Sequence, residues 1–434
     1  MNRIFRILGI GLAALALAGC SKNKAINAPA VSSGSANFSV VASIGTSVSA
    51  GYESGGLVVH HQLKAFPYAF AKQVGAAYAI PSVGADGIPA LLQIAGWTPA
   101  GQPVINNTGR TLGSPTNLTW PAPYNNMSVP GAVLFDVTSD ARYGSPPFTF
   151  IARTLPGSIL DQVAALNPTF VTFEMGANEV LGPASQGSGT PILNVATYAG
   201  LLHATLDSLQ ALLPGAKAAL FTVPDITSLP YFTTISPRLN AAGTCRVLGP
   251  GPAPLTDNDL VLLTAGPLLA TGHGVPAPCG GLGDALPAND VLYAAAVASI
   301  QAAVDGYNAA ISNEATARGW ALVDLNGLLR VAKSPGFVFQ GQTYTSAFVK
   351  GGLISLDGIH PTDLAHGIIG NALIDAVNEK FGARIPLLNL AEFATATSSR
   401  ARPADDAFGI PVLENADAVY GALFGWRGIY TPTP

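Results

Sequence analysis

The chain has 434 residues, of which 49% are hydrophobic and only 11% carry a charge. Its 21 basic and 25 acidic residues give a formal net charge of −4. The basic residues form no block, which excludes the electrostatic surface that nucleic-acid binding requires. The 48 glycines and 34 prolines favour long, turn-rich loops, so one α/β domain with insertions fits this length better than two domains.

Residues 1–19 have the pattern of a secretion signal. Two arginines precede the apolar stretch 7–17, which is shorter than the roughly 20 residues of a membrane-spanning helix. The tetrad at 17–20, Leu-Ala-Gly-Cys, resembles the lipobox of bacterial lipoproteins. This resemblance implies that Cys20 is acylated and becomes the mature N-terminus, and Ser21 after it favours the outer membrane. An ordinary secretion signal with an incidental cysteine is the alternative.

Three further segments follow the signal. Residues 20–36 show no apolar period and are expected to form a flexible, lipidated tether. The folded body is expected over 37–384, interrupted by long stretches without a regular pattern at about 79–150 and 227–287. The remaining residues, 385–434, contain no motif to which we can assign a role.

The order of apolar and amphipathic segments predicts an α/β fold. Strands are expected at 38–44, 169–175, 217–223 and 320–325, and helices at 67–77, 158–166, 197–213, 288–318 and 362–381. The first of these strands is β-branched and mainly apolar, as strands buried on both faces are. Because strands and helices alternate, we expect a mostly parallel sheet with helices on both faces.

The first candidate for chemistry is Ser47, in the block Gly45–Tyr52 directly after the first predicted strand. Ligands of open parallel sheets bind at the carboxyl ends of the strands, so this hydroxyl is expected where substrate would lie. On its own, the block is equally typical of a turn that caps a helix.

The second candidate is the pair formed by Asp357 and His360. A histidine can act as a general base when a carboxylate fixes its tautomer and stabilises the imidazolium that forms. The three-residue spacing lets the carboxylate curl back to the ring, and Pro361 then opens the last predicted helix. Alone, such a pair could also be a helix-capping segment with a surface histidine.

Two further blocks supply neutral hydrogen-bond donors. Asn178 follows the second predicted strand within the block Gly176–Glu179, and Gly131 lies within 126–132. Glycine has no side chain, so another group can approach its backbone amide closely. Donors of this kind stabilise the oxyanion that forms during acyl transfer.

Together, in order and placement, these blocks resemble the four sequence blocks of the SGNH (GDSL-like) hydrolases. The resemblance implies a flavodoxin-like, three-layer α/β/α fold with a mostly parallel sheet, and an esterase or lipase that uses no metal or cofactor. It implies that Ser47 is the nucleophile, His360 the base and Asp357 its partner. The oxyanion donors would then be the Ser47 amide, the Gly131 amide and the Asn178 side chain.

One position departs from the family pattern. The usual Gly-Asp-Ser-Leu is here Gly-Thr-Ser-Val, with Thr46 in place of the acidic residue. The missing aspartate is not the catalytic carboxylate, and threonine can also hydrogen-bond in the turn, so we expect activity to survive. A non-catalytic surface lipoprotein that keeps the fold and binds a ligand is the alternative.

The substrate is less well defined than the reaction. The two long loops hold apolar residues that could form an acyl pocket or lid, or small cores of their own: Trp97, Trp120, Tyr124, Leu229, Tyr231, Phe232 and 260–263. We expect a lipid or lysophospholipid acyl ester as substrate, although placement at a membrane fits this substrate and acylated glycans equally. An esterase that removes acetyl or acyl groups from glycans is the alternative, and the sequence sets no oligomeric state.

The remaining candidates are interpreted as structural. Cys245 and Cys279 are expected to form a disulfide in an exported protein, with two unpaired thiols as the alternative. His366 and Asp225 are expected in a helix and a turn, without a catalytic role. The chain has no G-x-S-x-G, P-loop or H-E-x-x-H motif, which argues against an α/β-hydrolase, a nucleotide-binding protein and a zinc protease.

Overall fold

The computed structural model describes residues 31–139, 148–394, 410–414, 420–421 and 423. Cys20 and the predicted signal lie outside the described residues. The chain divides into two compact units, Met1–Ser32 and Ser33–Pro434, and the fold described below is that of the second unit. No helix among the described residues is both long and apolar enough to cross a membrane.

A four-stranded parallel sheet forms the centre of the fold. Its strands are β1 (Val41–Gly45), β4 (Phe170–Glu174), β5 (Lys217–Phe221) and β8 (Ala321–Val323), in the order β1-β4-β5-β8. Every residue of β1 and β4 is buried, as their unbroken apolar pattern predicts. The segment 125–129 runs along the free edge of β1, where Ser43 N donates to Asn125 O (2.8 Å) and Met127 N donates to Ser43 O (3.0 Å).

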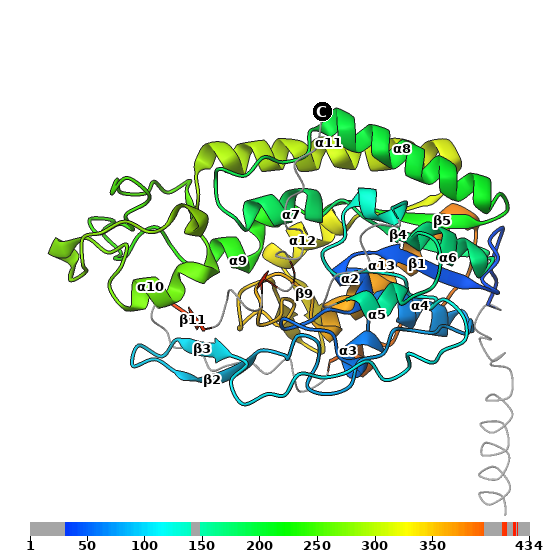
Figure 1. Ribbon diagram of the computed structural model, residues 1–434, viewed down its shortest axis with the longest axis horizontal. Coiled ribbons are helices and arrows are strands. Elements are labelled where there is room, and N and C mark those ends of the chain that lie inside the picture. The colour runs from blue at the N-terminus through cyan, green and yellow to red at the C-terminus, as the bar shows by residue number, and fades with distance from the viewer. Residues whose placement is uncertain (1–30, 140–147, 395–409, 415–419, 422, 424–434) are drawn as a thin grey trace, which may run out of the picture. The chain divides into compact units, whose positions relative to one another are not determined.

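Helices cover both faces of this sheet (Figure 1). One layer contains α4 (Phe66–Gln73) and α13 (Asp363–Phe381), and the other contains α6 (Ile159–Ala165), α8 (Val195–Leu212) and α11 (Ala294–Arg318). Successive strand residues serve opposite layers, since Phe170 packs in the first core and Val171 in the second. The predicted three-layer α/β/α fold with a mostly parallel sheet is therefore confirmed.

Two helices of the fold were not predicted. The first, α7 (Asn178–Ala184), contains Gly182 and Pro183, which are typical of turns. The second, α12 (Leu325–Lys333), starts two residues after β8 ends, so its first residue was assigned to the strand. In addition, α11 begins at Ala294, because the preceding residues form a short strand, β7 (Val291–Leu292), which pairs with β6 (Leu260–Val261).

The first long insertion is more regular than predicted. It contains an antiparallel pair, β2 (Gln93–Trp97) and β3 (Pro103–Asn106), and β11 (Val412–Leu413) adds to β3 in parallel. The C-terminal extension therefore packs on this insertion.

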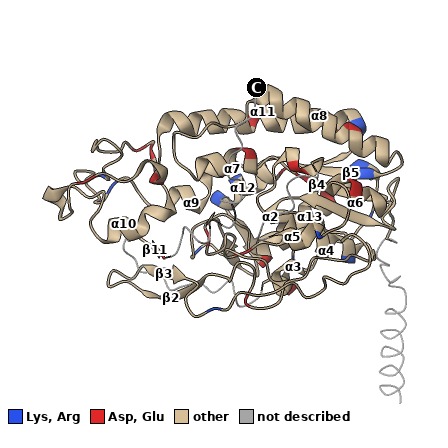
Figure 2. Cartoon of the chain, viewed as in Figure 1, with Lys and Arg blue, Asp and Glu red and all other residues tan. Residues whose placement is uncertain are grey.

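The remaining regular elements are short. They are α2 (Ser47–Ala50), α3 (Val59–Gln62), α5 (Thr149–Ala152), α9 (Pro230–Thr233), α10 (Gly266–Ala270), and a hairpin of β9 (Phe337–Phe339) and β10 (Gln342–Tyr344). Charged side chains are scattered over the described elements without a large cluster of one sign (Figure 2).

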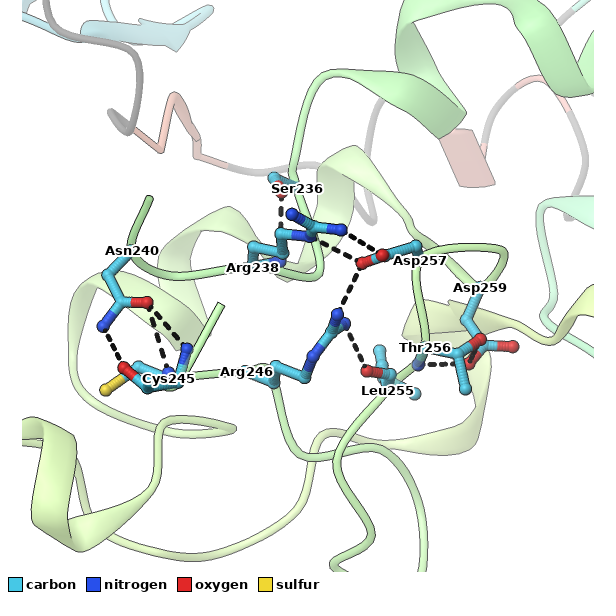
Figure 3. A network of polar contacts seen from close by, with 10 residues as sticks. Ser236, Arg238, Asn240, Cys245, Arg246, Leu255, Thr256, Asp257 and Asp259 are labelled. Atoms are coloured by element: carbon cyan, nitrogen blue, oxygen red, sulfur yellow. Dashed lines mark hydrogen bonds and ion pairs between the residues drawn. The ribbon is translucent and has the colours of Figure 1, made fainter. Parts of the chain in front are cut away.

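The second long insertion has its own small hydrophobic core and two kinds of cross-link. Cys245 and Cys279 are joined by a disulfide with an S–S distance of 2.04 Å. Arg238 and Arg246 both form ion pairs with Asp257 (Figure 3). These ion pairs are largely exposed, so the disulfide and the apolar core are the stronger restraints on this segment.

Candidate active site

Ser47 lies at the carboxyl end of β1, as the first residue of α2. A Cβ atom at Gly45 would come within 2.5 Å of Ser49 Oγ, so only glycine allows the chain to turn this tightly. Gly51, with φ of 77°, ends the short helix in the left-handed conformation that glycine tolerates. The predicted strand–turn–serine arrangement is therefore present, and its glycines are required by the geometry.

Thr46 is held by a buried carboxylate from the neighbouring strand. Its backbone amide donates to Glu174 Oε2 (3.1 Å) and its hydroxyl to Glu174 Oε1 (3.0 Å), while Ser49 Oγ also donates to Oε2 (3.0 Å). Burial raises the pKa of Glu174, and these hydrogen bonds act in the opposite direction. Glu174 does not stand out as a site residue in the sequence, although an acidic residue that ends a mainly apolar strand is an unusual signal.

Ser47, His360 and Asp357 form a continuous hydrogen-bonded row. His360 Nε2 lies 2.9 Å from Ser47 Oγ, and His360 Nδ1 lies 2.8 Å from Asp357 Oδ2. The serine and the histidine are 313 residues apart in the sequence, yet all three side chains are buried. A hydroxyl, an imidazole and a carboxylate in this order are the arrangement that serine hydrolases use.

Asp357 is surrounded by hydrogen-bond donors. Its Oδ1 accepts from the backbone amides of Ile359 and His360, both at 2.9 Å, and its Oδ2 accepts from the amide of Gly55 (2.9 Å). Burial alone would raise the pKa of this carboxyl, but the charge and hydrogen bonds of His360 lower the pKa to about 2. The group is therefore a carboxylate at neutral pH and can orient the imidazole.

The C-terminal extension also reaches this loop. The hydroxyl of Tyr420 donates to the backbone oxygen of Asp357 (2.5 Å), and its ring packs edge-on against Tyr231 with centroids 4.8 Å apart. Nothing in the sequence around Tyr420 indicated this contact, because it depends on the path of the chain through the fold.

Asn178 lies next to the row, and Gly131 lies in an adjoining turn. Asn178 is the first residue of α7, and its side-chain amide donates to the carbonyl of Ala132 (2.8 Å). Gly131 has a φ of 79°, and Val129 N ties its turn to Gly45 O at 3.0 Å. Asn178 lines the same pocket as Ser47, whereas Gly131 does not.

Ser47 and His360 line a pocket with a cavity volume of about 120 Å³. Apart from these two residues, Thr46 and Asn178, every lining side chain is apolar. Leucines and isoleucines of α12, α13 and the segment 353–361 contribute eight of the eighteen apolar side chains. The site is therefore built to receive a hydrophobic group beside a serine hydroxyl.

The long loops contribute little to the pocket. Of the apolar loop residues considered above, only Leu229 lines it. Tyr124, Tyr231 and Phe232 are buried in the main core, while Trp97 and Trp120 are exposed. The buried loop residues therefore pack in the hydrophobic core, as one of the two alternatives expected, and only Leu229 lines the pocket, to which the helices that follow β8 and His360 also contribute.

The other candidate residues have structural surroundings. Asp225 caps a short 3₁₀ turn by accepting from Thr227 N (3.1 Å). His366 is fully buried, and burial lowers its pKa to about 4 against the opposing effect of Asp363. Neither residue lines the pocket at Ser47, in agreement with their interpretation as structural residues.

The fold is that of an SGNH-type hydrolase. Residues 41–373 match the model of the GDSL-like lipase/acylhydrolase family, and the chain belongs to that family. It is therefore a hydrolase of ester bonds. The matched range includes both ends of the hydrogen-bonded row, from Ser47 to His360.

Solved structures with a similar fold include three bacterial proteins of low sequence identity. A protein of Parabacteroides merdae described as a GDSL-like lipase is 10% identical, with 80% of this chain and 98% of that chain covered and a TM-score of 0.36. The psychrotrophic esterase EstA of a Pseudoalteromonas species is 13% identical, with 79% and 97% covered and a TM-score of 0.32. Phospholipase A1 of Streptomyces albidoflavus is 14% identical, with 81% and 100% covered and a TM-score of 0.33. A sequence search of curated proteins gave no significant match.

Proposed function

We propose that this protein hydrolyses acyl esters of lipids or lysophospholipids, with Ser47 as nucleophile, His360 as general base and Asp357 as its partner. The observation that carries the proposal is the hydrogen-bonded row of these three side chains at the mouth of an apolar pocket. The row supplies the chemistry of acyl transfer, and the pocket supplies the binding energy for the acyl chain.

The distances favour a direct proton transfer. His360 Nε2, 2.9 Å from Ser47 Oγ, accepts the hydroxyl proton as Oγ attacks the ester carbonyl carbon. The imidazolium, which Asp357 stabilises at 2.8 Å, then gives this proton to the departing alcohol oxygen as the C–O bond breaks. Water attacks the acyl-enzyme with the same assistance, and its proton returns through His360 to Ser47 Oγ as the acid leaves.

The tetrahedral intermediates carry a negative oxygen that needs donors. We assign this role to the backbone amides of Ser47 and Gly131 and to the side-chain amide of Asn178. The hydrogen bond from Asn178 to Ala132 O (2.8 Å) supports the assignment, because it links this side chain to the turn that contains Gly131. Each preorganised donor contributes about 3 kcal/mol to the stability of the transition state.

The lining of the pocket supports a long acyl chain. Each methylene group that leaves water for an apolar wall contributes about 0.8 kcal/mol. We therefore expect kcat/KM to rise by up to about fourfold for each added methylene until the pocket is filled. A glycan deacetylase would gain nothing from this lining, since an acetyl group ends at its methyl carbon.

A panel of p-nitrophenyl esters from acetate to palmitate tests both parts of the proposal. We expect the highest kcat/KM at medium or long chains and a loss of about 10⁵-fold in kcat for Ser47→Ala. Ser208→Ala is the control, because Ser208 lies exposed on α8 and donates only to Ala204 O. A maximum at acetate would favour glycan ester removal, and unchanged turnover in Ser47→Ala would overturn the assignment of the nucleophile.

We further propose that the protein is exported and anchored by an acylated Cys20, with the outer membrane as its location. The lipobox-like tetrad at 17–20 supports this placement, which would bring the apolar pocket close to lipid substrates. Mass spectrometry of the mature N-terminus tests it directly. Cys20→Ser should release the protein from the membrane fraction, and an unmodified N-terminus in the wild type would contradict the proposal.

A further inference from the structure

Three buried side chains from distant segments meet beside the catalytic loop: Glu53, His61 and Asp363. Glu53 lies in the turn after α2, His61 in α3, and Asp363 at the start of α13. The exposed fractions of the three residues are 4%, 3% and 5%. Their nitrogen and carboxylate oxygen atoms all lie within 4.8 Å of one another.

His61 Nδ1 carries at most one hydrogen, which cannot be donated fully to both neighbouring carboxyl groups. His61 Nδ1 lies 2.9 Å from Asp363 Oδ1 and forms a hydrogen bond with it. The same nitrogen lies 3.1 Å from Glu53 Oε2, yet this oxygen has no hydrogen-bond partner among the described residues. A buried carboxylate oxygen without a donor is costly, so a cation bound between the two carboxyl groups would stabilise the cluster.

We propose that Glu53, His61 and Asp363 bind a divalent metal ion of the zinc class. One imidazole nitrogen and two carboxylate oxygens are a ligand set that Zn²⁺ accepts, in contrast to the six or more oxygen ligands of Ca²⁺. Two carboxylates also balance the charge of the ion, which a buried site requires.

The geometry agrees with this ligand set. Ligand atoms about 2.0–2.1 Å from a tetrahedral Zn²⁺ ion are separated by roughly 3.3 Å. The contacts of His61 Nδ1 with the two carboxylates, at 2.9 and 3.1 Å, are within a few tenths of an ångström of this value. Only small side-chain movements would therefore admit the ion.

A second buried imidazole lies beside the cluster. His366 follows Asp363 by three residues on α13, so the two side chains share one face of the helix. His366 has no exposed surface, and neither of its ring nitrogens has a hydrogen-bond partner among the described residues. Among the described residues, only Glu53, His61 and Asp363 form a group of three whose ligand atoms lie within 4.8 Å of one another, so His366 is a neighbour of the proposed site and not one of its ligands.

The ion would brace the catalytic loop and would not take part in hydrolysis. The turn that contains Glu53 also carries Gly55, whose amide donates to Asp357 Oδ2 (2.9 Å). Asp363 follows His360 by three residues. An ion bound by both segments would therefore hold the Asp357 carboxylate and the His360 imidazole in their relative positions. Removal of the metal should lower the stability of the protein more than the rate of hydrolysis.

The test is metal binding by the full-length protein after treatment with a chelator. Equilibrium dialysis against Zn²⁺, followed by elemental analysis, should give about one equivalent per chain. Glu53→Gln keeps the shape of the side chain but removes a charged ligand, and His61→Gln removes the nitrogen ligand, so both should lose this equivalent. His273→Gln is the matched control, since His273 pairs with Asp284 on the surface at 2.6 Å.

Thermal unfolding gives a second readout that does not depend on activity. Zn²⁺ at a hundredfold excess over its Kd should raise the Tm of the wild type and of His273→Gln by about 5 °C. The Tm of Glu53→Gln should not respond, and circular dichroism verifies that this variant is folded. Absence of saturable Zn²⁺ binding, equal binding by Glu53→Gln, or preference for Ca²⁺ over Zn²⁺ would each overturn the proposal.

Discussion

Thr46 and Glu174 form a contact that replaces the acidic residue of the usual Gly-Asp-Ser-Leu block. The threonine amide and hydroxyl donate to the glutamate carboxylate at 3.1 and 3.0 Å, and both residues are buried. The turn before Ser47 is therefore held by a carboxylate from the neighbouring strand β4 instead of by an aspartate of its own. The carboxyl group that the family pattern places in the turn is present but comes from another segment.

This contact predicts that restoring the family sequence will harm the protein. Thr46→Asp would place a second carboxylate against the buried Glu174, and like charges in a buried site repel strongly. We expect the free energy of unfolding to fall by about 2–4 kcal/mol, measured by urea denaturation. Unchanged stability would contradict the prediction.

The double variant Thr46→Asp with Glu174→Gln is the control for this effect. Removing the glutamate charge should return most of the lost stability, because the remaining aspartate can accept the hydrogen bonds of the turn. A coupling energy of about 1–3 kcal/mol between the two substitutions is expected. Additive effects would show that the loss has another cause.

The sequence sufficed for the sheet and its two helical layers, because β1, β4 and β5 are mainly apolar and alternate with helices. The sequence also indicated the row of Ser47, His360 and Asp357. Ser47 directly follows the first strand, and the other two directly precede the last helix, so the order of these elements places all three at one edge of the sheet. The sequence did not reveal Glu174 or Tyr420, whose contacts depend on neighbours across strands and across the chain. The contribution of α12 to the pocket at Ser47 could not be foreseen, because the sequence does not separate this helix from the strand before it.

Asp357 predicts a specific dependence of stability on pH. Its pKa of about 2 lies below the ordinary value of 3.8, so the folded state favours the ionised form. The ionised carboxylate therefore contributes about 2 kcal/mol to the free energy of unfolding. This contribution is fully present at pH values above the ordinary pKa and is lost as the pH falls through about 2. Urea denaturation of the wild type and of Asp357→Asn from pH 7 down to pH 2.5 should give a stability difference that narrows below about pH 4. A constant difference would argue against a lowered pKa.

The same variant, Asp357→Asn, tests the orientation of the imidazole. The amide that replaces the carboxylate would present either an oxygen or an N–H to His360 Nδ1, so the tautomer that accepts the Ser47 proton is no longer favoured. We expect kcat to fall by about 10⁴-fold with a small change in KM, measured with a p-nitrophenyl ester at neutral pH. A loss below about tenfold would show that the carboxylate has no such role.

The pocket predicts that acyl-chain preference can be changed from one face of α12. Ala332 lines the pocket, whereas Val331 points away and is 38% exposed. Ala332→Phe should fill part of the cavity and lower kcat/KM for a dodecanoyl ester by about tenfold, with little effect on a butanoyl ester. Val331→Phe is the matched control and should change neither. Equal losses for both esters in Ala332→Phe would indicate general damage to the site.

The position of the disulfide between Cys245 and Cys279 predicts that its removal lowers stability but leaves the hydrolysis of short-chain esters nearly unchanged. The bridge closes a loop with a sequence separation of 34, so its removal in Cys245→Ser/Cys279→Ser should destabilise the insertion by about 3–4 kcal/mol. Ser47 lies on β1 and α2, outside this insertion, and a butanoyl ester should be hydrolysed at nearly the normal rate. The long-chain ester should be affected more, because Leu229 lines the pocket and Tyr231 N donates to Gly358 O (2.9 Å).

Thermal unfolding and parallel assays with both esters test the prediction, and wild-type protein with reductant should behave like the double variant. Equal loss of both activities would instead mean that the insertion supports the catalytic row itself.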